Sequence, residues 1–139
     1  MTSSPRLAHV GVRATDLGRS IIFWRDALGL NVAGQFDGCI DLTDGRSNFR
    51  VFQHQGGDRP PHVRGMLDYL HVGVIVADLG AVAARCTALG FEITWDGVSD
   101  GRPYDPASPP SESFKVEDPD GITVDVTASL SQWPGVAGD

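Results

Sequence analysis

HVGVRATDLG at residues 9–18 is repeated as HVGVIVADLG at residues 71–80, with seven identities in ten positions. The offset of 62 residues exceeds the usual solenoid periods and indicates one duplicated supersecondary module. Each copy begins with a β-branched, glycine-containing run typical of a strand, and an acidic residue suited to start a helix follows. The duplication therefore places His9 and His71 at equivalent positions of two similar units.

The first copy continues with the signals of one helix and three strands. Apolar residues at helical spacing follow Thr15 or Asp16, either of which can cap the helix. Gly29 suits the left-handed residue that ends a helix. Strands are predicted before and after this helix, at about residues 7–13, 30–36, 39–43 and 48–54.

The second copy repeats the same order of elements. Asp78 is the predicted helix cap, and the apolar face of that helix runs from Leu79 through Cys86 to Leu89. The turn Asp118–Gly121 separates two further strands. The remaining strands are predicted at about residues 69–76 and 91–96. Each module is therefore expected to be βαβββ, which makes the fold class α+β.

The length of 139 residues suits one domain with a substantial core. Within it, the linker is identified by its Gly and Pro content, and the tail by its lack of periodicity. We expect module one at residues 5–54, a linker at 55–67, module two at 68–129 and an irregular tail at 130–139.

Composition excludes several classes of partner. A net charge of -7 argues against nucleic acid and anionic membranes, both of which require clustered Lys and Arg. No apolar run approaches the length of a membrane span, and the N-terminus lacks the apolar stretch of a secretory signal. Cys39 and Cys86 form no disulfide framework, and Cys86 is expected to be a small buried residue. A cytoplasmic protein is the expectation.

Several motifs together resemble the vicinal oxygen chelate superfamily, which includes glyoxalase I, extradiol dioxygenases and bleomycin-resistance proteins. They are the duplicated βαβββ plan, the histidine in each first strand, FW-x3-LGL at residues 23–30 and DPDGITVDV at 118–126. The resemblance covers nearly the whole chain. It implies curved mixed sheets around a cup that holds a divalent metal, and a cup formed within one chain or across a dimer. The long linker favours a homodimer.

The resemblance also implies a ligand set. Carried over by position, the ligands are His9, His71 and Asp125, the last where the family usually has Glu. Nothing in NFRVFQHQ, residues 48–55, supplies the first-module carboxylate, and Arg50 takes the best-aligned position. Two imidazoles and one carboxylate suit Fe(II), with Mn(II), Zn(II) or Ni(II) as alternatives.

Each candidate also has a structural interpretation. A strand histidine is more often structural than a ligand, and duplication alone can preserve two of them. Arg50 either clamps a carboxylate or phosphate of the substrate or pairs with Asp41. Trp95 and Tyr104 either line the mouth of the cup or are an ordinary packed residue and a surface residue.

Two functions follow from the resemblance. The first is a metal-dependent enzyme acting on a small, oxygen-rich organic substrate, with isomerase, lyase and dioxygenase activities all open. No residue is nominated as its general base. The alternative is a non-enzymatic protein that binds a drug or metabolite, as the bleomycin-resistance branch does. The missing carboxylate and Arg50 favour this alternative.

Overall fold

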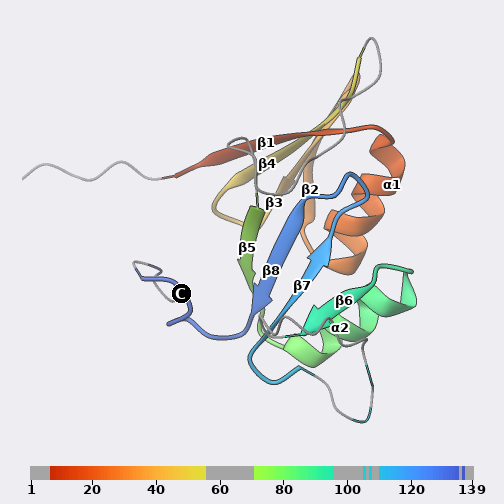
Figure 1. The fold of residues 1–139 in the computed structure, drawn as a ribbon. Helices are drawn as coiled ribbons and strands as arrows, with labels where there is room; N and C mark the ends of the chain where they lie inside the picture. The colour runs from red at the N-terminus through yellow and green to blue at the C-terminus, as the bar shows by residue number, and fades with distance from the viewer. Residues whose placement is uncertain are drawn as a thin grey trace, which may run out of the picture. The chain divides into compact units, whose positions relative to one another are not determined.

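The computed structural model describes residues 7–55, 71–95, 105, 107, 110–134 and 136, with the backbone alone of Trp95. The chain folds as two compact units, and the boundary between them falls after Pro60. Each unit contains one four-stranded sheet with helix along it (Figure 1). None of the described helices is long and apolar enough to cross a membrane.

The first unit has the strand order β1-β4-β3-β2. The first and last strands of the module, β1 and β4, run parallel, and the other neighbours are antiparallel. Its elements are β1 (His9–Ala14), α1 (Leu17–Ile21), η1 (Ile22–Ala27), β2 (Asn31–Phe36), β3 (Cys39–Thr43) and β4 (Asn48–Gln53).

The second unit repeats this plan with the strand order β5-β8-β7-β6. Again the first and last strands pair in parallel and the others are antiparallel. Its elements are β5 (His71–Ile75), α2 (Leu79–Ala88), β6 (Ile93–Trp95), β7 (Ser113–Glu117) and β8 (Thr123–Thr127). The predicted pair of βαβββ modules is confirmed. The predicted linker lies outside the described residues apart from Gln55.

Aspartates begin both helices, as the repeat predicts. The Asp16 carboxylate accepts a hydrogen bond from the Arg19 backbone N–H at 3.1 Å, and Asp78 accepts one from Ala81 at 3.0 Å. Asp16 rather than Thr15 is therefore the cap of the first helix. These bonds satisfy donors that a helix start leaves without a partner.

The first helix departs from the predicted α-helix. From Ile22 onward it is a π-helix, in which the Leu28 backbone N–H donates to the Phe23 carbonyl, five residues back, at 3.1 Å. Gly29 then takes the left-handed conformation, with φ of 95°. In the second helix the predicted apolar face stops early, because Leu89 is the C-terminal cap and is 43% exposed.

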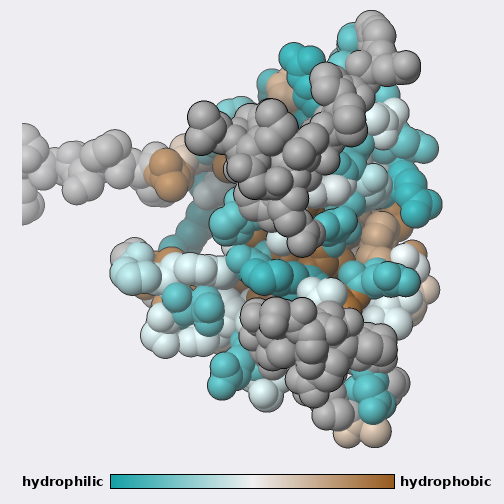
Figure 2. Space-filling view, viewed as in Figure 1, coloured by the Kyte–Doolittle hydropathy of each residue, from teal (hydrophilic) through white to brown (hydrophobic). Residues whose placement is uncertain are grey.

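Each sheet buries one face against its own helix. In the first unit the Trp24 ring lies 4.3 Å from the Phe49 ring, measured between centroids. In the second, Cys86 is fully buried, as predicted, and burial raises the pKa of its thiol to about 11. Hydrophilic side chains dominate much of the described surface visible in Figure 2. The opposite face of each sheet carries the polar residues described next.

Candidate functional site

The candidate residues occupy equivalent positions on the two sheets. Gly11 of β1 pairs with Arg50 of β4, which pairs in turn with Asp41 of β3. In the second sheet, Gly73 pairs with Asp125, and Asp125 pairs with Lys115. Side chains alternate between the faces of a strand, so His9 and His71, two residues before the glycines, share these faces. Each module thus carries a cross-strand ion pair at these positions, and the two pairs have opposite polarity.

Arg50 forms a bidentate ion pair with Asp41. Its Nε lies 2.5 Å from Asp41 Oδ1, and its second nitrogen, Nη2, lies 2.8 Å from Oδ2. The guanidinium also lies over the rings of Phe36 and Phe52, at 5.4 and 5.9 Å from their centroids. Of the two interpretations of Arg50, the structure therefore shows the pairing with Asp41. The guanidinium of Arg50 is therefore fixed in orientation, and its charge is partly neutralised by Asp41.

Asn48 connects this ion pair to His9. The His9 ring nitrogen Nδ1 lies 2.6 Å from Asn48 Oδ1, and the Asn48 side chain also hydrogen-bonds to Asp41. An ionised carboxylate only accepts hydrogen bonds, so Asn48 presents its NH₂ to Asp41 and its oxygen to His9. His9 then donates from Nδ1, which leaves the Nε2 lone pair as its acceptor. Metal-ligating histidines are oriented in this manner by a partner on the other ring nitrogen.

The pKa of Asp41 makes the chain Arg50–Asp41–Asn48 sensitive to acid. The hydrogen bonds from Arg50, and secondarily from Asn48, hold that pKa below its ordinary value despite desolvation. Since the folded-state pKa is lowered, the stabilisation is complete above the unfolded-state pKa of about 3.9 and is lost as the pH falls through the folded value. We expect Asp41→Asn to lower stability at pH 6 and to have a smaller effect at pH 2.

Urea unfolding from pH 2 to pH 6 measures this difference. The matched control is Asp26→Asn, because Asp26 forms an exposed ion pair with its neighbour Arg25. Exposed pairs contribute little to stability, so this control should track the wild type at every pH. Parallel pH profiles for the two variants would contradict the expectation.

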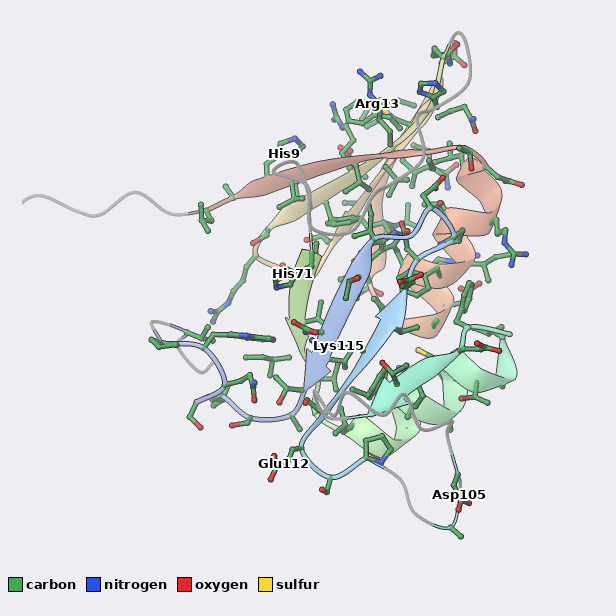
Figure 3. The ribbon with its side chains drawn as sticks, in the orientation of Figure 1. His9, Arg13, His71, Asp105, Glu112 and Lys115 are labelled. Carbon is green, nitrogen blue, oxygen red and sulfur yellow. The ribbon has the colours of Figure 1, made fainter. Side chains whose placement is uncertain are left out.

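In the second unit, Asp125 lies between a histidine and a lysine. Its Oδ2 is 3.6 Å from Nε2 of His71, and its Oδ1 forms an ion pair with Nζ of Lys115. Their strands flank β8, and Figure 3 shows His71 and Lys115 on them. The His71–Asp125 distance exceeds a hydrogen bond, but two ligand bonds of about 2.1 Å each can span it. The spacing of His71 and Asp125 therefore allows both side chains to bind one ion.

The predicted ligands are divided between the units. His71 and Asp125 come together, whereas His9 belongs to the first unit, with Asn48 and Asp41 as its neighbours. Within either unit, the described residues contain no group of three His, Cys, Asp or Glu side chains that suits an ion. The predicted substrate residue Tyr104 and the side chain of Trp95 lie outside the described residues.

Two polar residues of the site were not predicted from the sequence. Asn48 orients His9, and Lys115 holds the carboxylate of Asp125. The turn at residues 118–121 carried a signal for the second contact, because a hairpin centred there places Lys115 opposite Asp125. Asn48 had no such local signal, since its partner His9 is 39 residues away in the sequence.

The chain matches a known sequence family and resembles several solved structures. The sequence model described as Glyoxalase/Bleomycin resistance protein/Dioxygenase superfamily matches residues 6–126. Among solved structures, the oxidase ChaP-H2 is similar over 91% of this chain and 95% of its own, with a TM-score of 0.66 and 21% identity. No curated protein matches the chain.

Two further structures resemble the chain at similar levels. The trypanothione-dependent glyoxalase I of Leishmania major has 22% identity and a TM-score of 0.66, over 89% of this chain and 86% of the enzyme. The protein SMU.1112c has 20% identity and a TM-score of 0.64, over 90% of this chain and 99% of its own. At these identities the likeness shows the fold alone.

Proposed function

Because the chain belongs to the Glyoxalase/Bleomycin resistance protein/Dioxygenase superfamily, we propose that it is a metal-dependent enzyme acting on a small, oxygen-rich organic substrate. The proposed ligands are His9, His71 and Asp125. The observation that carries the proposal is the 3.6 Å spacing of His71 Nε2 and Asp125 Oδ2, which suits two donors to one divalent ion. Isomerase, lyase and dioxygenase activities all remain open.

A bound ion would supply Lewis-acid chemistry at the substrate oxygens. The chain's own residues would prepare the donors. Asn48 holds His9 with its Nε2 lone pair available, and Lys115 occupies one oxygen of Asp125 while the other oxygen faces His71. A hydrogen-bonded imidazole keeps its orientation, which reduces the reorganisation needed when an ion binds. Arg50 is the proposed contact for an anionic group of the substrate.

A non-enzymatic drug- or metabolite-binding protein is the second candidate. It is favoured by the two ion pairs at the last-strand positions, Arg50 with Asp41 and Lys115 with Asp125. Asp41 and Asp125 therefore each have a cation of the same sheet beside them. A divalent ion must compete with the ammonium of Lys115 for Asp125.

The same proposal extends to the organisation of the protein. We infer modules at residues 5–54 and 68–129, joined by the linker at 55–67 and followed by the tail at 130–139. The length and the Gly and Pro content of the linker support exchange of modules in a homodimer. The cytoplasm is the proposed compartment, and the two free cysteines, both buried, support it.

Metal analysis of the untagged protein tests the enzyme proposal. After dialysis against Fe(II), Mn(II) or Zn(II), mass spectrometry of the metal content should find about one ion per chain with one of them. His9→Ala and His71→Ala should each abolish it, whereas His62→Ala, in the predicted linker, should not. Metal content far below one ion, or content indifferent to His9 and His71, would favour the binding protein instead.

A further inference from the structure

The tail after β8 returns to the first strand of its own module. A β-carbon built at Gly73 would lie 2.6 Å from Cη2 of Trp133 and 2.8 Å from its Cζ2. Side-chain β-carbons do not approach other atoms this closely. The six-membered ring of Trp133 therefore occupies the space that any other residue at position 73 would fill.

This ring lies on the face that carries the candidate ligands. Gly73 is directly opposite Asp125 in the parallel β5–β8 pair, and His71 precedes it by two residues. Residues at this spacing project from the same face of a strand. The order across the sheet is therefore the Trp133 ring over β5, then Asp125 on β8, then Lys115 on β7.

The first module has the same arrangement with a different ring. A β-carbon at Gly11 would lie 3.1 Å from Cε2 of Phe52 and 3.7 Å from Nε2 of His9. Both HVGV repeats thus use their glycine to admit an aromatic ring beside the strand histidine. In the first module the ring comes from β4, and in the second it comes from the tail.

Hydrogen bonds between residues close in the sequence hold the start of the tail in place. The Ser129 backbone N–H donates to Thr127 Oγ1 at 3.1 Å, and the Gln132 N–H donates to the Ser129 carbonyl at 3.3 Å. The hydroxyls of Ser129 and Ser131 lie 2.9 Å apart. These bonds form a compact turn that positions Trp133 against the sheet. Trp133 remains half-buried there and keeps exposed surface.

We propose that Trp133 is a ligand-contacting wall of the site formed by His71 and Asp125, and that it selects flat aromatic ligands carrying an anionic group. This proposal deepens the function proposed above and rests on it for the location of the site. An indole offers a broad, rigid surface for stacking at small entropic cost. The ammonium of Lys115 lies two strands away, pairs with Asp125 and is 45% exposed, and its other N–H donors supply the contact for the anionic group.

Binding of 1-anilinonaphthalene-8-sulfonate, a fluorescent aromatic anion, tests this. Trp133→Ala should weaken the affinity of the folded protein for the probe about 3- to 10-fold, the range given by one aromatic pair. Trp133→Phe should restore most of it. The matched control is Leu130→Ala, because Leu130 is an apolar residue of the same tail and is 53% exposed. Equal affinities for the wild type and Trp133→Ala, or equal losses in Trp133→Ala and Leu130→Ala, would overturn the proposal.

Gly73→Ala is a second variant that tests the position and the role of Trp133. The added methyl group meets the far end of a side chain rather than backbone, so the ring of Trp133 can move aside while the sheet is retained. We expect the same loss of probe affinity, with unchanged circular dichroism and a red-shifted tryptophan emission. Unchanged emission and affinity in Gly73→Ala would contradict the placement of Trp133.

A parallel titration with Mn(II) separates this proposal from the function it rests on. Indole is not a ligand for the ion, so Trp133→Ala should bind Mn(II) as the wild type does. If the wild type binds no divalent ion, the enzyme proposal fails, while the dependence of the probe on Trp133 can still hold. If Mn(II) binds but the probe is indifferent to Trp133, only the aromatic wall is refuted.

Discussion

Replacing Trp24 by alanine is expected to lower the free energy of unfolding of the first unit by about 3–5 kcal/mol. The side chain is fully buried, meets Phe23 edge to face at 5.0 Å and lies 4.3 Å from the ring of Phe49. Its removal loses these contacts and leaves a cavity between helix and sheet. Urea unfolding followed by circular dichroism measures the change.

Trp24→Phe is the matched control for that variant. The indole N–H of Trp24 is buried without a hydrogen-bond partner among the described residues. Phenylalanine keeps most of the aromatic contact and removes this unsatisfied donor, so its cost should be well below that of alanine. A loss below about 1 kcal/mol for Trp24→Ala would be out of line with a fully buried aromatic side chain.

Asp125→Asn is expected to reduce the affinity for divalent ions by more than about 100-fold. This is a larger loss than is expected for a residue that only hydrogen-bonds to a metal ligand. The amide keeps the size of the side chain but removes the charge that faces His71 at 3.6 Å. Competition with a fluorescent chelator, using Mn(II) and Zn(II), measures the change. An affinity within about threefold of the wild type would remove Asp125 from the ligand set.

Lys115→Met should raise the affinity for divalent ions. It removes the ammonium that competes for Asp125 and keeps a side chain of similar length. Because Lys115 is 45% exposed, water screens its charge, and the gain should be about tenfold or less. Opposite changes in Asp125→Asn and Lys115→Met would identify charge, rather than misfolding, as the cause.

Local signals in the sequence were sufficient to predict the fold. Asp16 and Asp78 begin helices because a carboxylate accepts from backbone N–H groups three residues on, a property of a few adjacent residues. The π-helix was not predictable in the same way. Over a single turn its apolar spacing is close to that of an α-helix, and its Trp24 packs against Phe49, which is distant in the sequence.

The site was predicted less completely because it depends on pairing between strands. The pairing of Arg50 with Asp41 was one of two interpretations of the sequence, and one short hairpin brings these two residues together. Asn48, by contrast, reaches His9 only through the parallel pairing of β1 and β4, which joins the ends of the module. Trp133 is harder still, because its position depends on the path of a tail without periodicity.

The reversed polarity of the two cross-strand pairs distinguishes the duplicated halves chemically. In the first half the acid lies on the third strand and the base on the last strand, whereas in the second half these positions are exchanged on the same backbone plan. A chimera with two second halves would present a last-strand aspartate in each, whereas two first halves would present only arginines there. The chemical difference between the halves is therefore an exchange of charge rather than a change of architecture.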